Sequence, residues 1–321
     1  MIKKSIGVLT SGGDAPGMNA AIRAVVRTGI YNGFKVFGVL RGYNGLINGD
    51  IYEMNLRDVS DKIHLGGTML RTARSSEFVT EAGMAKAIKS CNRVGLEGLV
   101  VIGGDGSFRG ARDLSERGFP CIGVPATIDN DISCSDYTIG YDTALNTATQ
   151  MIDRLRDTCE SHDRCSVVEV MGRRAGYLAV NIGIAVGATS VIIPEIREDM
   201  DTLIDRIKIG QKNGKRHFTI VVAEGVGGVD EIAKTIVEKT GIESRATILG
   251  HVQRGGSPSV RDRVLASQMG NAAVELLCNS ASNRVVVVRD SKIINYDISE
   301  ALDMKKEFDD YLYKVANEIS I

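Results

Sequence analysis

Short apolar runs alternate along the chain with longer stretches in which apolar residues recur every three or four positions. The short runs are rich in β-branched residues and predict buried strands of a parallel sheet, at residues 5–10, 35–40, 98–103, 121–124, 165–171, 190–194 and 218–225. The longer stretches predict amphipathic helices, at residues 18–33, 82–95, 144–161, 176–187, 201–214 and 230–241. Strand–helix alternation of this extent is typical of α/β proteins with doubly wound, Rossmann-like parallel sheets.

Polar, glycine-rich clusters follow four of these strands. They read SGGDAPG (11–17), GGDGS (103–107), PATIDND (125–131) and MGRRAG (171–176). Ligands of doubly wound sheets bind outside the carboxyl ends of the strands. We therefore expect all four clusters at one edge of one sheet, where they form a shared binding site.

The GGDGS cluster combines glycines with a carboxylate and a helix expected to start near Ser107. Glycines let a ligand approach the backbone, and a helix start offers free N–H groups to phosphate. Asp105 among them makes sense if Mg²⁺ lies between it and the phosphate. The spacing of Gly104, Gly106 and Gly110 matches neither a Walker loop nor a dinucleotide fingerprint. A tight strand-to-helix turn without a ligand is the alternative.

The TIDND stretch places two carboxylates two positions apart, directly after a predicted strand. In extended backbone Thr127, Asp129 and Asp131 share one face, which favours a joint chemical role. A polar turn is the alternative, since Asp and Asn are favoured in turns.

Composition narrows the class of protein. A chain of 321 residues is long enough for roughly two domains, and its net charge of −1 argues against a nucleic-acid or membrane-surface partner. The six cysteines show no CxxC spacing, which is typical of a reducing compartment. The N-terminus lacks the long apolar run of a signal peptide, and no apolar stretch reaches the ~20 residues needed to span a bilayer. We expect a soluble, cytoplasmic protein.

The motifs SGGDAPGMNAAIR, GGDGS, TIDND, EVMGRRAG and LGHVQRGGSP occur in this order and resemble those of the bacterial ATP-dependent 6-phosphofructokinases. The resemblance implies a larger ATP-binding domain at residues 1–140 and 253–303, and a smaller fructose 6-phosphate-binding domain at residues 141–252 and 304–321. It also implies a glycolytic kinase that transfers the γ-phosphoryl group of MgATP to the 1-hydroxyl of fructose 6-phosphate. The family resemblance further implies an allosteric homotetramer.

The resemblance also assigns roles to single residues. Asp129 would be the general base for the sugar hydroxyl, with Thr127 and Asp131 orienting it. Charge on the transferring group would be stabilised by the amide of Gly13, Arg74 and Arg173. The implied ATP-binding residues are Gly13, Arg74, Ser75, Gly104, Asp105, Gly106 and Ser107, with Asp105 as the Mg²⁺ ligand. The implied substrate-binding residues are Thr127, Asp129, Arg164, Met171, Gly172, Arg173, Glu224, Arg245, His251 and Arg254. Of these, Arg164 and Arg245 would reach across from a neighbouring subunit.

Two other functions are possible on the same fold, a pyrophosphate-dependent phosphotransferase and a non-catalytic sensor. A related branch uses pyrophosphate and typically has an Asp at position 106 and a Lys at position 126, where this chain has Gly106 and Ala126. ATP is therefore favoured, although Ala126 itself departs from the usual Gly. A non-catalytic nucleotide or sugar-phosphate sensor would tolerate the loss of Asp105, Asp129 or Arg173, and all three are present. Arg71 also replaces a usual Gly, so that either the ATP-side loop is rearranged or this side chain points to solvent.

The resemblance to the family's effector site is incomplete. Its phosphate-binding positions match Arg23, Arg27, Arg156, Gly187 and Lys215, although a solvated basic face would look the same. Leu56, Thr189 and Asn213 stand where the family usually has Arg, Glu and Lys. Because the replaced Glu is thought to hold the effector's Mg²⁺, we expect regulation by phosphorylated ligands to be altered or blunted.

Overall fold

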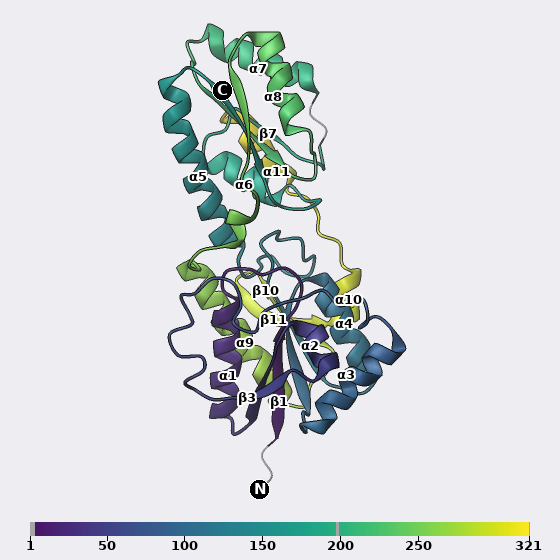
Figure 1. Ribbon diagram of the computed structural model, residues 1–321. Helices are drawn as coiled ribbons and strands as arrows, with labels where there is room; N and C mark the ends of the chain where they lie inside the picture. The colour runs from purple at the N-terminus through teal and green to yellow at the C-terminus, as the bar shows by residue number, and fades with distance from the viewer. Residues whose placement is uncertain (1–3, 197–198, 321) are drawn as a thin grey trace. The chain divides into compact units, whose positions relative to one another are not determined.

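The computed structural model describes residues 4–196 and 199–320. The chain divides into two compact units, each built around its own sheet (Figure 1). The larger unit comprises Met1–Ile128, Ile132–Thr143 and Arg254–Lys306, and the smaller comprises Asp129–Asp131, Ala144–Gln253 and Glu307–Ile321. The predicted α/β class with two parallel-rich sheets is confirmed.

The larger unit contains a seven-stranded sheet in the order β11-β10-β5-β4-β1-β2-β3. Its strands are β1 (Ser5–Thr10), β2 (Lys35–Val39), β3 (Ile51–Met54), β4 (Gly98–Gly103), β5 (Cys121–Pro125), β10 (Arg284–Arg289) and β11 (Lys292–Asp297). Only the edge strands β3 and β11 pair antiparallel with their neighbours. The central strands β1 and β4 are fully buried, as strands covered on both faces must be.

Helices cover both faces of this sheet (Figure 1). They are α1 (Met18–Tyr31), α2 (Gly42–Asn48), α3 (Glu81–Arg93), α4 (Asp105–Glu116), α9 (Val260–Cys278) and α10 (Ile298–Asp303). Their ends carry ordinary capping signals. Thr80 accepts a hydrogen bond from the amide of Gly83 at the start of α3, and Gly33 and Gly95 adopt positive φ just after α1 and α3.

The smaller unit contains a four-stranded parallel sheet in the order β7-β8-β6-β9. The strands are β6 (Cys165–Val170), β7 (Ser190–Ile192), β8 (Phe218–Ala223) and β9 (Ser244–Ile248). The remaining elements are α5 (Tyr141–Ser161), α6 (Tyr177–Ala185), α7 (Met200–Lys212), α8 (Val229–Thr240), the 3₁₀ turn η1 (Gly250–Arg254) and α11 (Asp310–Glu318). Within the described residues, no helix is long and apolar enough to cross a membrane.

The expectation that all four polar clusters share one sheet edge is wrong. The first three follow β1, β4 and β5, which are adjacent in the larger sheet. The fourth, residues 171–176, follows β6 and therefore belongs to the sheet of the smaller unit. The alternation of strands and helices predicts where the strands lie in the sequence. It does not predict which of the two sheets each strand joins. Each sheet thus has polar clusters of its own.

Candidate functional site

Three polar turns meet at the carboxyl edge of the larger sheet. The amide of Ser11 donates a hydrogen bond to the carbonyl of Ile102 (2.9 Å), and the amide of Ala126 donates one to the carbonyl of Gly103 (2.9 Å). These bonds tie the turns after β1, β4 and β5 to one another. Ala126 is buried, and its methyl group is accommodated in this arrangement.

The turn after β1 brings Gly13 against a distant arginine. A Cβ at Gly13 would lie 2.2 Å from Nη1 of Arg254, so only glycine permits this close approach. The Arg254 guanidinium also donates to the carbonyl of Asp14 (3.4 Å). A predicted ATP-side amide and a predicted sugar-side cation are therefore neighbours in the larger unit.

The turn after β4 opens directly into α4, which begins at Asp105 rather than near Ser107. A Cβ added at Gly106 would meet nothing within 4 Å, so space lies open beside the first turn of the helix. Free amides and the helix dipole make such a turn favourable for phosphate. Asp105 is half-buried at this end. One carboxylate beside a phosphate site suits Mg²⁺, which binds through one or two carboxylates plus phosphate oxygens.

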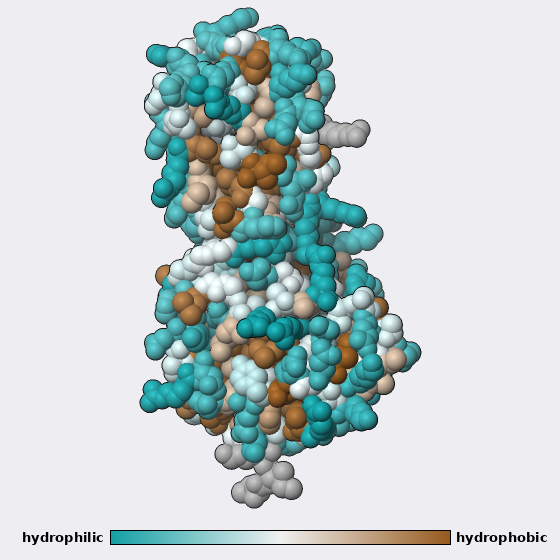
Figure 2. All heavy atoms as spheres, in the orientation of Figure 1, coloured by the Kyte–Doolittle hydropathy of each residue, from teal (hydrophilic) through white to brown (hydrophobic). Residues whose placement is uncertain are grey.

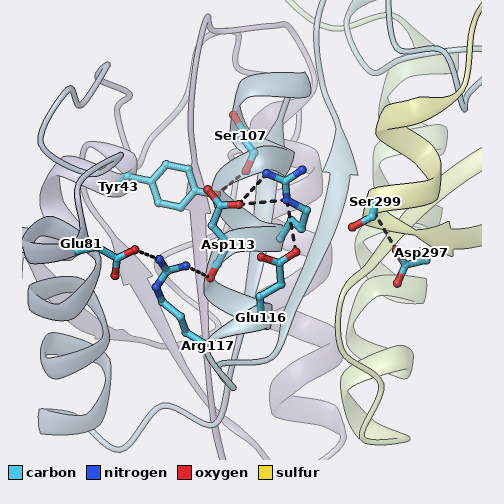
Figure 3. A network of polar contacts seen from close by, with 9 residues as sticks. Tyr43, Glu81, Ser107, Asp113, Glu116, Arg117, Asp297 and Ser299 are labelled. Carbon is cyan, nitrogen blue, oxygen red and sulfur yellow. Dashed lines mark hydrogen bonds and ion pairs between the residues drawn. The ribbon is translucent and has the colours of Figure 1, made fainter.

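A buried tyrosine holds the start of α4 in place. The hydroxyl of Tyr43, in α2, donates to the carbonyl of Ser107 (2.5 Å), as Figure 3 shows. Its ring stacks on Phe78 at 3.9 Å between centroids. Burial raises the pKa of Tyr43 well above its usual value, so the hydroxyl remains a donor. At the other end of α4, Arg117 pairs with Glu81 of α3 (Figure 3). No sequence motif points to Tyr43.

The segment before α3 lies over the turn after β1. The hydroxyl of Thr72 donates to the carbonyl of Gly12 (2.7 Å), and that of Thr10 donates to the carbonyl of Arg71 (2.8 Å). Arg71 has φ of 59°, a left-handed conformation that favours glycine. Its side chain is exposed, which favours the solvent-pointing alternative for this residue.

Two of the predicted ATP-binding residues lie in the same segment. Arg74 is exposed, so its guanidinium is accessible to a ligand. The hydroxyl of Ser75 accepts a hydrogen bond from the amide of Phe78 (3.3 Å), which fixes the turn leading to α3.

In the smaller unit, two carboxylates converge on one guanidinium. Nε of Arg173 lies 3.1 Å from Asp129, and Nη1 lies 3.6 Å from Asp131. Asp129 is only 1% exposed, whereas the Arg173 side chain is 52% exposed. A cation this close favours the ionised form of a buried carboxylate. This cluster joins the third and fourth polar clusters of the sequence. Thr127 belongs to the larger unit, where its carbonyl accepts a hydrogen bond from Thr138 (2.7 Å).

The backbone around Arg173 is held by two residues from other segments. The amide of Arg173 donates to the carboxylate of Glu224, although Arg173 adopts an unusual φ of 54°. The amide of Met171 donates to the side-chain oxygen Oε1 of Gln253 (3.2 Å), a residue that is fully buried. Gln253 is a supporting residue that the sequence did not single out. Gly172 has φ of 137°, and His251 is exposed in η1.

Arg164 and Arg245 lie apart from this cluster. Both pair with Glu243, at 2.9 Å and 3.0 Å. Arg164 precedes β6 and Arg173 follows it, so the length of β6, about 20 Å, separates them. Arg245 pairs with Ser166 at the same end of β6 as Arg164. Within one chain, neither arginine reaches a ligand bound at Arg173.

The candidate effector residues form separate pairs. Burial and the nearby Arg27 lower the pKa of Arg23 in α1, and burial and the nearby Arg156 lower the pKa of Lys215. In each pair the second cause is a neighbouring like charge, which a bound anion would offset. Gly187 has φ of 59° before β7. A hollow of about 970 Å³ in the smaller unit is lined by residues that include Thr189, Asn213 and Lys215.

The larger unit has glycine-lined turns beside a helix start, which suit phosphate, and the smaller unit has a buried carboxylate beside an arginine, which suits a general base. Both features are typical of α/β enzymes that act on phosphorylated ligands. A sequence model described as Phosphofructokinase matches residues 5–277. The chain belongs to the phosphofructokinase family.

Similar proteins agree over nearly the whole chain. The ATP-dependent 6-phosphofructokinase of Clostridium tetani is 58% identical over 99% of both chains, and that of Clostridium botulinum is 57% identical over the same shares. Among solved structures, phosphofructokinase from Saccharomyces cerevisiae matches with a TM-score of 0.89 and 37% identity, over 99% of this chain and 47% of the yeast chain. A pyrophosphate-dependent phosphofructokinase from Marinobacter aquaeolei has a TM-score of 0.85 at 23% identity, over 96% of this chain and 86% of that one, and shares the fold.

Proposed function

We propose that this protein transfers the γ-phosphoryl group of MgATP to the 1-hydroxyl of fructose 6-phosphate, giving fructose 1,6-bisphosphate and ADP. The observation that carries the proposal is the buried Asp129, held 3.1 Å from the Arg173 guanidinium. Relatives 57–58% identical over nearly their full length are ATP-dependent 6-phosphofructokinases. A glycolytic role in the cytoplasm follows from this activity.

Asp129 is the general base in the proposed mechanism. As the sugar oxygen attacks the γ-phosphorus, the bond to the β–γ bridging oxygen breaks, and the hydroxyl proton passes to the Asp129 carboxylate. An ordinary carboxylate suffices, since the alcohol becomes acidic only as attack proceeds. Arg173 holds the base and offers positive charge to the transferring group, while Asp131 binds the other side of the same guanidinium.

The nucleotide tail binds along the turns of the larger unit in this proposal. The residues that hold it are Gly13, Arg74, Ser75, Gly104, Gly106 and Ser107. Asp105 would hold Mg²⁺, which neutralises phosphate charge when bound. The open space at Gly106 supports the assignment of ATP as the phosphoryl donor, because a longer side chain at this position would fill the space needed by a nucleotide.

In this proposal, sugar binding is assigned to the residues around Asp129, to Thr127 and to the segment 251–254. Thr127, Met171, Gly172, Arg173 and Glu224 surround the sugar, whereas His251 and Arg254 bind its phosphate. Arg164 and Arg245 lie at the far end of β6. Their contribution therefore requires a second subunit.

A homotetramer is the proposed assembly. Apolar side chains gather on the smaller unit over α6 and α11 in Figure 2. The exposed apolar residues of that unit include Ile209, Tyr311 and Ile319. Contiguous exposed apolar surface commonly marks a protein–protein interface.

Regulation by phosphorylated ligands is proposed to be altered. Arg23, Arg27, Arg156 and Lys215 keep the positive charge of an effector site. Thr189 and Asn213, which stand where the family usually has Glu and Lys, supply neither a carboxylate nor a cation to the hollow that they line, although Asp205 and Arg206 also line it. Activity titrated with ADP and phosphoenolpyruvate at subsaturating fructose 6-phosphate tests this. Strong responses of the usual kind to both would overturn it.

The purified protein, assayed with fructose 6-phosphate and either MgATP or Mg–pyrophosphate, tests the main proposal. We expect turnover with MgATP, little with pyrophosphate, and a loss of roughly 10²–10⁴-fold in kcat for Asp129→Ser. Faster turnover with pyrophosphate would favour the rival phosphotransferase. A fully active Asp129→Ser variant would show that the base is wrong, and sugar-phosphate binding without turnover would favour the sensor.

A further inference from the structure

Strand β6 carries a carboxylate where its alternation calls for an apolar residue. Cys165 and Val167 point into the apolar core of the smaller unit, and Glu169 is the next residue on the same face. It is the only residue of β6 that is not fully buried. β6 lies between β8 and β9, so Glu169 occupies an interior position of the sheet.

Glu169 lines the same hollow as the carboxylate–arginine cluster. This hollow, of about 790 Å³, is bounded by Asp131, Glu169, Arg173, Arg174, Ala175 and Glu224. Glu169 is in register with Val222 of β8, and Glu224, the first residue after β8, follows Val222 by two positions. From strand spacing and rise, the two backbones are about 8 Å apart. Both side chains can therefore reach one small ligand.

Nothing within the described chain satisfies the Glu169 carboxylate. Among residues 4–196 and 199–320, its side chain has no hydrogen bond or ion pair with another residue, whereas its backbone is held by the strand ladders and by a hydrogen bond from the amide of Leu249 to its carbonyl (3.1 Å). Burial, with Glu224 and Asp230 nearby, raises the pKa of Glu169. Both effects disfavour the charged group in the folded protein. The protein itself therefore supplies no partner that would stabilise a glutamate at this position.

We propose that Glu169 is a second sugar-recognising carboxylate, which accepts a hydrogen bond from a hydroxyl of the phosphorylated sugar beside Glu224 and thereby sets specificity among sugar phosphates. The inference rests on the proposed function and deepens it. Three carboxylates around one hollow repel phosphate and favour hydroxyl donors, while Arg173 and Arg174 limit the negative charge. No group of three or more metal-binding side chains with a geometry suited to a metal ion occurs in the described chain.

The experiment compares Glu169→Gln with the wild type and with Glu238→Gln, a control on the exposed face of α8. For Glu169→Gln we expect KM for fructose 6-phosphate to rise about 10- to 100-fold, as when a hydrogen bond to a charged group is lost. The KM for ATP should change less than about twofold. Fructose 6-phosphate analogues lacking one ring hydroxyl at a time then locate the contact. For the analogue that lacks the hydroxyl bound by Glu169, the wild type and Glu169→Gln should have nearly equal KM values, because neither protein can then make this hydrogen bond.

Thermal unfolding separates recognition from a structural role. A carboxylate kept for its substrate is unfavourable in the empty protein, so Glu169→Gln should unfold at the same or a higher temperature than the wild type at pH 7. A markedly lower unfolding temperature, an unchanged KM for the sugar, or an equal loss with every analogue would overturn the inference alone. Absence of wild-type turnover with fructose 6-phosphate would overturn the proposed function, and this inference with it.

Discussion

Arg173 shows how much one residue of this site depends on its surroundings. Its φ of 54° is unfavourable for a side chain other than glycine, by about 1–3 kcal/mol. The conformation is maintained because Glu224 accepts its amide while Asp129 and Asp131 bind its guanidinium. The hydrogen bond and the ion pairs thus offset the cost of the backbone conformation, and they fix the cation that the proposed reaction needs.

Gly106 offers a clean test of nucleotide use. A Cβ there would meet nothing within 4 Å, so Gly106→Asp should fold with a nearly unchanged unfolding temperature. The new carboxylate would occupy and repel phosphate space, and we expect kcat/KM for ATP to fall at least ~100-fold. Coupled assays with MgATP, alongside Gly106→Ala, measure this. Activity near the wild-type level in Gly106→Asp would contradict the assignment of the ATP site.

At the scale of elements, helix α4 connects the buried Tyr43 to the proposed phosphate site. Its first turn faces open space at Gly106, and the same turn is bonded from behind by Tyr43. A helix start can hold phosphate only while its amides stay aimed at the ligand. The position of α4 is therefore a functional property.

Tyr43→Phe removes the hydroxyl and leaves the Ser107 carbonyl without this donor. We expect a loss of about 1 kcal/mol in the free energy of unfolding. KM for ATP should rise a few-fold, with little change in KM for fructose 6-phosphate. Denaturant unfolding and steady-state kinetics give both values. A matched control is Tyr52→Phe on the edge strand β3, where the tyrosine side chain is exposed. Equal rises in both KM values would argue against a specific effect on α4.

The sequence predicted the regular elements where periodicity was strong and failed where it was not. Every strand and helix that the periodicity predicted is present, with its ends shifted by a few residues. The missed elements are the short α2 and β3, the half-exposed β9, the hairpin of β10 and β11, and the helices α9, α10 and α11, of which α9 is long. These elements owe their form to pairing and packing with distant segments, which local patterns do not reveal.

At the scale of the whole molecule, motifs indicated candidate residues but not which sheet would hold them. Residues 129–131 pack with the smaller unit, although their neighbours Ile128 and Ile132 belong to the larger. Supporting residues such as Tyr43 and Gln253 were invisible to the sequence, because their importance lies in single long-range hydrogen bonds.

Sites completed across subunits predict that two inactive variants rescue each other. Asp129→Ser removes the proposed base, and Arg164→Ala removes a cation proposed to act in the neighbouring site. Mixed and reassembled, the two should regain up to about a quarter of wild-type activity per subunit, since some sites would then combine intact parts. Activity is measured before and after reassembly, with each variant alone as the control. No recovery in proven hybrid oligomers would refute completion in trans.

The contact between Gly13 and Arg254 limits how mutations here can be interpreted. Any larger residue at position 13 must displace a guanidinium assigned to the other substrate. In a genetic screen, such an allele would look like a defect in both binding events although it altered only one codon. Because one substitution at this position alters both binding events, selection cannot adjust either of them alone through residue 13.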